Sequence, residues 1–185
     1  MRWDVTTTPI AEPVSIAEVK DHLRTTGTAE DAFITNLIVA TREHCENWLG
    51  RKLMHQTISQ WVDQWPEWHV DLAVGPASTL IAVYTYAESG TQTSHTITNF
   101  YLQPGLAPRL FRNAISWPSA GRVADGIEIS YAVGFGAAVD VPPAIRHGIL
   151  LLVAHLYQNR GDSPAKASLD SGAEQLWRPY RSIRL

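Results

Sequence analysis

The sequence lacks the features of secreted, membrane and cysteine-dependent proteins. It has one cysteine, Cys45, so it can form neither a disulfide within the chain nor a cysteine-based zinc site. The first ten residues lack the apolar core of a signal peptide. The uninterrupted apolar run at residues 148–154 is far shorter than the roughly 20 residues that cross a bilayer. We therefore expect a protein made and kept in a reducing cytosol, with no membrane partner.

Basic runs and catalytic motifs are also missing. The chain has 15 Lys and Arg against 18 Asp and Glu, a formal net charge of −3, and no segment gathers the bases into a patch. Binding duplex DNA through its phosphates would need such a patch, so a DNA-binding module is a disfavoured alternative. The motifs GxSxG, P-loop and HExxH do not occur, and no GxGxxG follows a strand. We expect no enzyme, no catalytic residue and no cofactor.

The best-defined element is a helix at residues 143–160. Pro142 suits the residue just before a helix, and Gly161 suits its end. Apolar residues follow helical spacing between them, at Ile145, Ile149, Leu152 and Leu156. Further apolar residues surround this stripe, which is typical of a helix buried on several sides. We interpret it as the central helix of the domain.

Two further helices are expected near the N-terminus, after an extended arm at residues 1–14. Ser15 and Glu18 have the spacing of a capping box and predict a short helix at 15–24. A single apolar face predicts a longer helix at 29–49, which should pack on the central one.

After residue 52 the apolar pattern changes to a period of two, which is typical of strands. Short strand candidates, among them Phe100–Gln103 and Ile127–Val133, are separated by breaks containing proline or glycine. The fold class is therefore α+β: a small helical bundle with an antiparallel β insert and a short C-terminal helix and tail. The expected parts are a helical core at 1–52 and 134–170, the insert at 53–133 and a tail at 171–185.

Histidines in the insert provide the main alternative function. His55, His69 and His95 could meet and make a small metal-binding or enzymatic domain. No two of them have tight metal-ligand spacing, so we predict no metal site. Cys45 lies on an apolar helical stripe and is expected to be a buried structural residue. His147 and His155, two turns apart on the central helix, are expected with Trp48 at a subunit interface.

The C-terminal tail at 171–185 is rich in residue types that carry binding energy. Its anchors are Trp177, Arg178, Pro179, Tyr180, Arg181 and Arg184. Trp, Tyr and Arg are over-represented at binding hot spots, and proline lowers the entropy lost when a tail becomes ordered. We expect the tail to be a docking element; the competing interpretation is that Trp177 folds back onto the subunit's own helices.

Six stretches, taken in chain order, resemble one protein family. They are PVSIAEVKDHLR at 13–24, EDAFITNLIVATREHCENWLGRKL at 30–53, QW at 60–61, YAVGFG at 131–136, VPPAIRHGILLLVAHLYQNR at 141–160 and LWRPYR at 176–181. Together they resemble the head–tail connector (adaptor, or head-completion) proteins of tailed phages. The branch with a β insert also occurs in prophages and gene transfer agents.

This resemblance implies a structural protein of the virion. Family members form a homo-oligomeric ring, commonly a dodecamer, between the portal protein at the capsid vertex and a tail-side connector, stopper or tail protein. The ring extends the DNA channel, and DNA passes through without sequence-specific binding. The resemblance places the tail against the portal, and it implies synthesis in the bacterial cytoplasm before assembly.

Overall fold

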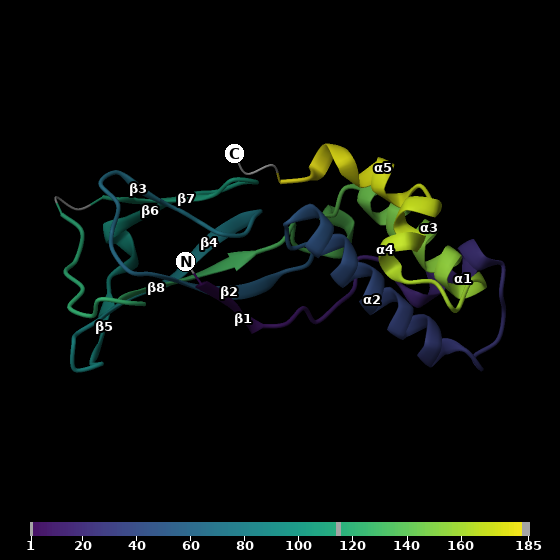
Figure 1. Ribbon diagram of the computed structural model, residues 1–185, viewed down its shortest axis with the longest axis horizontal. Coiled ribbons are helices and arrows are strands. Elements are labelled where there is room, and N and C mark those ends of the chain that lie inside the picture. Colours follow the sequence, from purple (N-terminus) through teal and green to yellow (C-terminus); the bar gives the residue numbers. More distant parts are fainter. Residues whose placement is uncertain (1, 114–115, 183–185) are drawn as a thin grey trace. The chain divides into compact units, whose positions relative to one another are not determined.

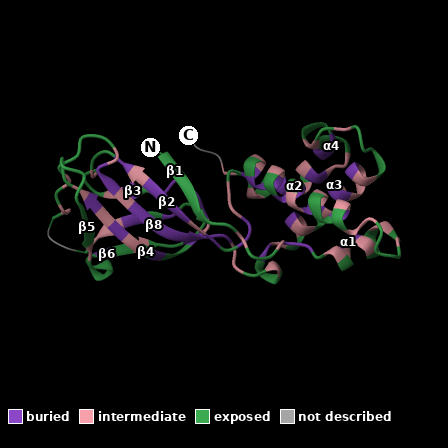
Figure 2. Cartoon of the chain, turned by 90° about the horizontal axis from the view of Figure 1, so that it is seen from below, coloured by how far each residue is buried: buried purple, intermediate pink, exposed green. Residues whose placement is uncertain are grey.

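The computed structural model describes residues 2–113 and 116–182 and has two compact units. Residues 1–9 and 55–134 form one, called the β unit, and residues 10–54 and 135–185 form the other, called the helical unit. Each unit has its own hydrophobic core, visible as buried segments in Figure 2. The α+β class expected from the sequence is confirmed (Figure 1).

The β unit contains two antiparallel sheets. Among the described residues the larger has the strand order β1-β2-β8-β4-β5, and the smaller has the order β3-β7-β6. The strands are β1 (Arg2–Thr7), β2 (Gln56–Val62), β3 (His69–Asp71), β4 (Ala77–Tyr86), β5 (Gln92–His95), β6 (Phe100–Gln103), β7 (Arg109–Arg112) and β8 (Ile127–Val133). A single 3-10 turn, η1 (Ile97–Asn99), leads into β6.

Strand register decides which side chains enter the core of the β unit. β8 lies in the middle of the larger sheet, where Tyr131 opposes Ile58 of β2 and Ile129 opposes Val83 of β4. Directly opposed residues of an antiparallel pair point to the same face of the sheet. These four residues therefore share one face, and they pack in one buried cluster with Leu110 of the smaller sheet.

A polar network without charged side chains is buried inside the β unit. The side-chain oxygen of Gln60 accepts hydrogen bonds from the backbone N–H of Ala73 (2.6 Å) and from the hydroxyl of Tyr131 (3.2 Å). Its amide nitrogen donates to the backbone carbonyl of Asp71 (3.1 Å), and the backbone N–H of Val74 donates to the Tyr131 hydroxyl (3.3 Å). Because buried backbone groups are costly when unpaired, this network fixes the segment 71–74.

The structure places residues 2–7 in a strand, whereas the sequence pattern suggested an extended arm of the helical core. β1 pairs with β2, and Trp3 and Val5 lie opposite Gln60 and Ile58. The outer edge of β2 would otherwise leave its backbone hydrogen-bonding groups unpaired, and β1 satisfies them. Residues 1–9 therefore belong with the β unit rather than with the helical core.

The helical unit contains the helices that the sequence predicts, together with short C-terminal ones. The elements are α1 (Ile16–Leu23), α2 (Asp31–Leu49), η2 (Ala138–Asp140), α3 (Pro143–Gln158), α4 (Pro164–Asp170), α5 (Ala173–Trp177) and η3 (Arg178–Tyr180). The helices expected at 15–24, 29–49 and 143–160 are confirmed as α1, α2 and α3. None of the described helices combines the length and apolarity needed to cross a membrane.

Local capping chemistry explains where these helices begin and end. The hydroxyl of Ser15 accepts from the backbone N–H of Glu18 (3.2 Å), and the Glu18 carboxylate accepts from the backbone N–H of Ser15 (2.8 Å). This is the predicted capping box at the start of α1. α2 ends at Gly50, whose φ of +65° is the left-handed conformation that glycine adopts without strain.

A buried ionic network joins α2 to the segments on either side of it in the sequence. The carboxylate of Glu46 accepts from Lys52 (2.9 Å), from Arg42 (3.3 Å) and from the backbone N–H of Leu53 (3.0 Å). Arg42 also donates to Glu12 (2.7 Å), and burial raises the pKa of the Glu12 carboxyl although Arg42 opposes this. The network therefore holds the chain where it enters and leaves the helical unit.

Candidate functional site

The C-terminal segment lies on α2 and α3 rather than extending freely. The ring of Trp177 is fully buried, and its indole N–H donates to the backbone carbonyl of Ile145 on α3 (3.1 Å). A Cβ atom at Gly148 would lie 2.3 Å from the indole nitrogen of Trp177. Only glycine therefore leaves room for the indole against α3, and the ring also lies near Trp48, with ring centroids 6.2 Å apart.

This geometry corrects the expectation for Trp177. A side chain with 0% exposure in its own core is not available as an anchor for a partner. The competing interpretation, in which Trp177 packs onto the subunit's own helices, describes the structure. The sequence contained the signal in Gly148, a glycine within the most apolar helix, but its partner lies 29 positions further along the chain.

Helices α4 and α5 are fixed to α2 through a polar contact. The imidazole Nε2 of His44 lies 3.1 Å from the hydroxyl oxygen of Ser168, and that hydroxyl donates to Glu174 (2.7 Å). Burial lowers the pKa of His44, and the carboxylate of Glu174 acts in the opposite direction. At neutral pH the imidazole of His44 is therefore uncharged while α4 and α5 are packed against α2.

Beyond Trp177 the chain is held by the C-terminal end of α2. The guanidinium of Arg51 donates to the backbone carbonyl of Tyr180 (2.7 Å), and the backbone N–H of Ser182 donates to the carbonyl of Leu49 (2.8 Å). The guanidinium of Arg181 lies over the Trp48 ring, 4.9 Å from its centroid. Trp48 is thus a half-buried platform under the tail. The sequence pattern did not indicate a role for Arg51 or Leu49.

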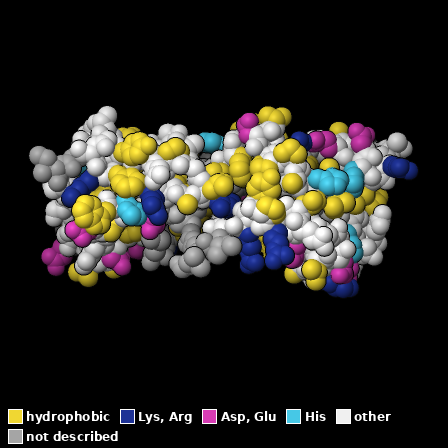
Figure 3. All heavy atoms as spheres, turned by 90° about the horizontal axis from the view of Figure 1, so that it is seen from above, with side chains coloured by type: hydrophobic (Ala, Val, Ile, Leu, Met, Phe, Trp, Pro, Cys, Tyr) yellow, Lys and Arg dark blue, Asp and Glu magenta, His cyan; other side chains and the backbone are white. Residues whose placement is uncertain are grey.

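The outward side of this segment is positively charged. Arg178, Pro179 and Arg181 are exposed, and Tyr180 is half-buried. No carboxylate in the described part of the chain pairs with Arg178 or Arg181. We call Arg178, Pro179 and Arg181 the tail surface. Figure 3 shows Lys and Arg side chains gathered on the displayed face of the helical unit. Arg184, the remaining predicted anchor, lies outside the described residues.

The two histidines expected at a subunit interface have different surroundings. His147 is exposed, and its ring meets the edge of His22 with the two centroids 6.2 Å apart. His155 is half-buried and lies 3.0 Å from the carboxylate of Asp162. The interface role of Trp48, His147 and His155 stays a prediction.

The histidines of the insert contact different neighbours. His69 packs on Phe111 with ring centroids 5.3 Å apart, and His95 lies 2.8 Å from the hydroxyl of Thr85. Among the described residues these histidines form no common group, and the group of three possible metal ligands lies in the helical unit instead. The alternative of a metal or enzymatic site built on His55, His69 and His95 therefore gains no support from the geometry.

Solved structures share this fold over the whole chain. A chain from the neck of an empty gene transfer agent (GTA) particle, computed with C6 symmetry, superposes with a TM-score of 0.85 and 24% identity. The match covers 100% of this chain and 97% of that one. A chain from the virion of a native GTA particle gives 0.82 at 24% identity, and one from a native neck computed with C12 symmetry gives 0.82 at 23%. Both cover 100% of this chain and 97% of the other.

The fold is therefore shared with chains from the neck and virion of gene transfer agent particles. Residues 13–103 match the family described as phage gp6-like head-tail connector protein. The resemblance to the head–tail connector family that the sequence predicts is confirmed by this match. No curated protein sequence matches the chain significantly.

Proposed function

We propose that this protein is a structural head–tail connector subunit of a phage or phage-like particle. In this proposal it forms a homo-oligomeric ring between the portal protein and the tail and extends the DNA channel. The observation that carries the proposal is the full-length likeness to a GTA neck chain, which includes both the helical unit and the β unit. The family match at 13–103 supports the same conclusion.

The ring would contain twelve copies. A similar chain comes from a neck computed with C12 symmetry, and a closed ring of identical subunits requires two different faces of each subunit to match. DNA would move through the lumen without specific binding, which fits a formal net charge of −3 and the absence of a basic run.

The portal contact would involve the tail surface of Arg178, Pro179 and Arg181. These side chains are exposed while the backbone beneath them is fixed by Arg51 and Leu49. A pre-ordered surface loses less entropy on binding than a free tail. Guanidinium groups that have no carboxylate partner among the described residues suit an acidic partner surface, because they form bidentate contacts with carboxylates.

The ring proposal is tested in particles produced from cells that lack this gene. We expect heads without attached tails, restored when the wild-type gene is supplied, and a twelve-fold density between portal and tail in reconstructions of the restored particles. Tailed particles in the absence of the gene, or a single copy at the vertex, would contradict the proposal.

The docking proposal is tested with the double variant R178E/R181E. Truncation of 171–185 is unsuitable, because it removes Trp177 from the core. We expect the reversed charges to leave the circular dichroism unchanged and to lower the melting temperature only slightly, through loss of the Arg181 contact with Trp48, but to abolish binding to heads that contain the portal. The matched control R178K/R181K keeps the charge and should bind more strongly than R178E/R181E but more weakly than the wild type, because lysine cannot form the bidentate contacts. Normal binding by R178E/R181E would show that these residues are not the docking contact.

A further inference from the structure

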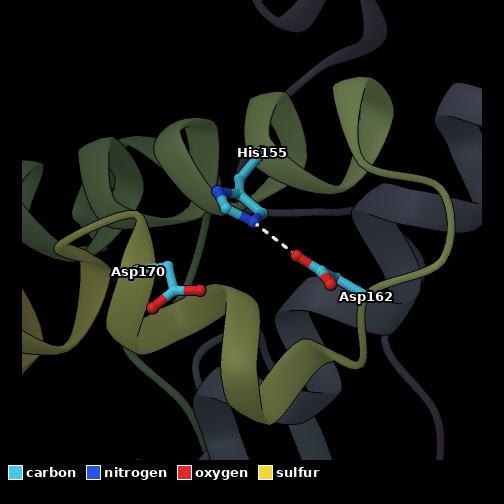
Figure 4. A group of neighbouring side chains, drawn as sticks. All are labelled: His155, Asp162 and Asp170. Atoms are coloured by element: carbon cyan, nitrogen blue, oxygen red, sulfur yellow. Dashed lines mark hydrogen bonds and ion pairs between the residues drawn. The ribbon is translucent and has the colours of Figure 1, made fainter.

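Three side chains that can ligate a metal ion converge where α3 is followed by α4. His155 lies in the last turn of α3, Asp162 in the connecting turn, and Asp170 at the end of α4. One ligand atom from each lies within 4.8 Å of the other two. Figure 4 shows the imidazole of His155 directed towards Asp162, with Asp170 beside them.

The spacing of the first two ligands suits a shared ion. Nε2 of His155 lies 3.0 Å from a carboxylate oxygen of Asp162. Neighbouring ligands around an ion with bonds of about 2.0–2.2 Å lie roughly 3–3.5 Å apart, so the ion can replace this hydrogen bond after a small adjustment. Asp170 is exposed, so its side chain can rotate by the remaining distance without disturbing the core.

The electrostatics of the group favour a cation. Asp162 and Asp170 bring two carboxylates to the group. Lys166 occupies the other oxygen of Asp162 at 3.0 Å, so two carboxylates face one ammonium group and negative charge is left over. The C-terminal end of α3, where His155 lies, adds the partial negative charge of its carbonyl groups.

We propose that His155, Asp162 and Asp170 form a binding site for a divalent transition-metal ion of the zinc class. An imidazole ligand selects Zn²⁺ over Mg²⁺ and Ca²⁺, which prefer all-oxygen sites. Three protein ligands leave positions for water, and the bound ion would fasten α4 to α3. The sequence pattern predicted no metal site. These three residues are separated by a turn and a helix, so their spacing in the sequence did not reveal that they lie together. The site is independent of the proposed connector function.

The test uses the full chain, freed from any histidine tag and from metal by dialysis against a chelator. Titration with ZnCl₂ in a calorimeter should give one ion per chain, and saturation should raise the melting temperature by several degrees. Co²⁺ should give a visible absorption band that reports its coordination. MgCl₂ should leave the melting temperature unchanged.

Two variants distinguish Zn²⁺ binding at this site from non-specific binding elsewhere on the chain. H155A should lose the calorimetric signal, and D170N, altered at an exposed position, should bind Zn²⁺ at least tenfold more weakly while melting like the metal-free wild type. H147A removes an exposed histidine of the same helix and should bind normally. If the wild type takes up no Zn²⁺, or if H155A and D170N respond as H147A does, His155 and Asp162 share only a hydrogen bond and the proposal is wrong.

Discussion

The two units solve the problem of buried polar groups in opposite ways. The β unit buries a neutral network in which Gln60 and Tyr131 satisfy the backbone of the segment 71–74. The helical unit buries charges, those of Glu46 and Arg42, and the Trp177 side chain fills the space beside Gly148 in its core. In the β unit, the neutral network is surrounded by paired strands. In the helical unit, the packing of the core depends on Trp177, which lies late in the chain. The comparison predicts that the two units respond differently to mutation.

The largest effect is expected from Trp177→Ala. Removing a large buried aromatic side chain costs about 3–5 kcal/mol of the free energy of unfolding. Because the lost contacts all belong to the helical unit, hydrogen exchange should accelerate in α3 and α5 and remain slow in β2 and β8. The control W68A removes a tryptophan that is 70% exposed in the β unit and should change little. Equal acceleration in both units would show that they unfold as one.

A smaller effect is expected in the β unit from Gln60→Leu. The substitution keeps the volume but leaves the backbone groups of Asp71 and Ala73 without their partners, which costs about 1–3 kcal/mol. Urea unfolding measures the loss in the free energy of unfolding. Amide hydrogen exchange should become faster at residues 71–74 but not in the helices. Q64L changes an exposed glutamine nearby and serves as the control. A loss as small as that of Q64L would mean that the Gln60 network does not stabilise the unit.

Removing the capping box by Ser15→Ala should have a still smaller effect. The lost N-cap hydrogen bond costs about 1 kcal/mol and acts on α1 alone. The control S15T keeps a hydroxyl that can accept from the backbone N–H of Glu18 and donate to its carboxylate, and it should retain stability. Thermal melts of the three proteins check the order: wild type and S15T together, S15A below both.

The smallest effect is a pH dependence carried by His44. Burial lowers the pKa of its imidazole below the ordinary value of 6.5, so the unfolded chain binds a proton more readily than the folded one. The stability that depends on His44 is present above pH 6.5 and is lost as the pH falls through the lower, folded value. Melts at pH 7.5 and 5.5 should show a larger drop for wild type than for H44Q. An equal drop in H44Q would assign the pH dependence to other groups.

The sequence predicts most of the helical unit because its signals are local. The capping residues Ser15 and Glu18, the helical spacing behind Pro142 and the stop at Gly50 all act within a few residues of the helix they define. The strands Phe100–Gln103 and Ile127–Val133 were recognisable for the same reason, since each is a short apolar run between turns.

What the sequence could not supply depends on partners far along the chain. Residues 2–7 become a strand because β2 offers an edge whose paired residues lie 50 to 59 positions further along the chain. Trp177 looks like a binding anchor until Gly148 is placed beside it. The group of His155, Asp162 and Asp170 likewise exists only once α4 lies against α3. Periodicity carries no information about such pairings.

The path of the chain through its two units has a consequence for synthesis on the ribosome. The chain starts in the β unit, moves to the helical unit at residue 10, returns at 55 and leaves again at 135. All described strands of the β unit precede residue 135. That unit can therefore fold before α3, on which α1 and α2 pack, has been made. The core of the helical unit is complete only after α5 has been made, because Trp177 belongs to it. A nascent chain that stops short of this residue would combine a complete β unit with an incomplete helical core, whose exposed apolar surface would make the product prone to aggregation.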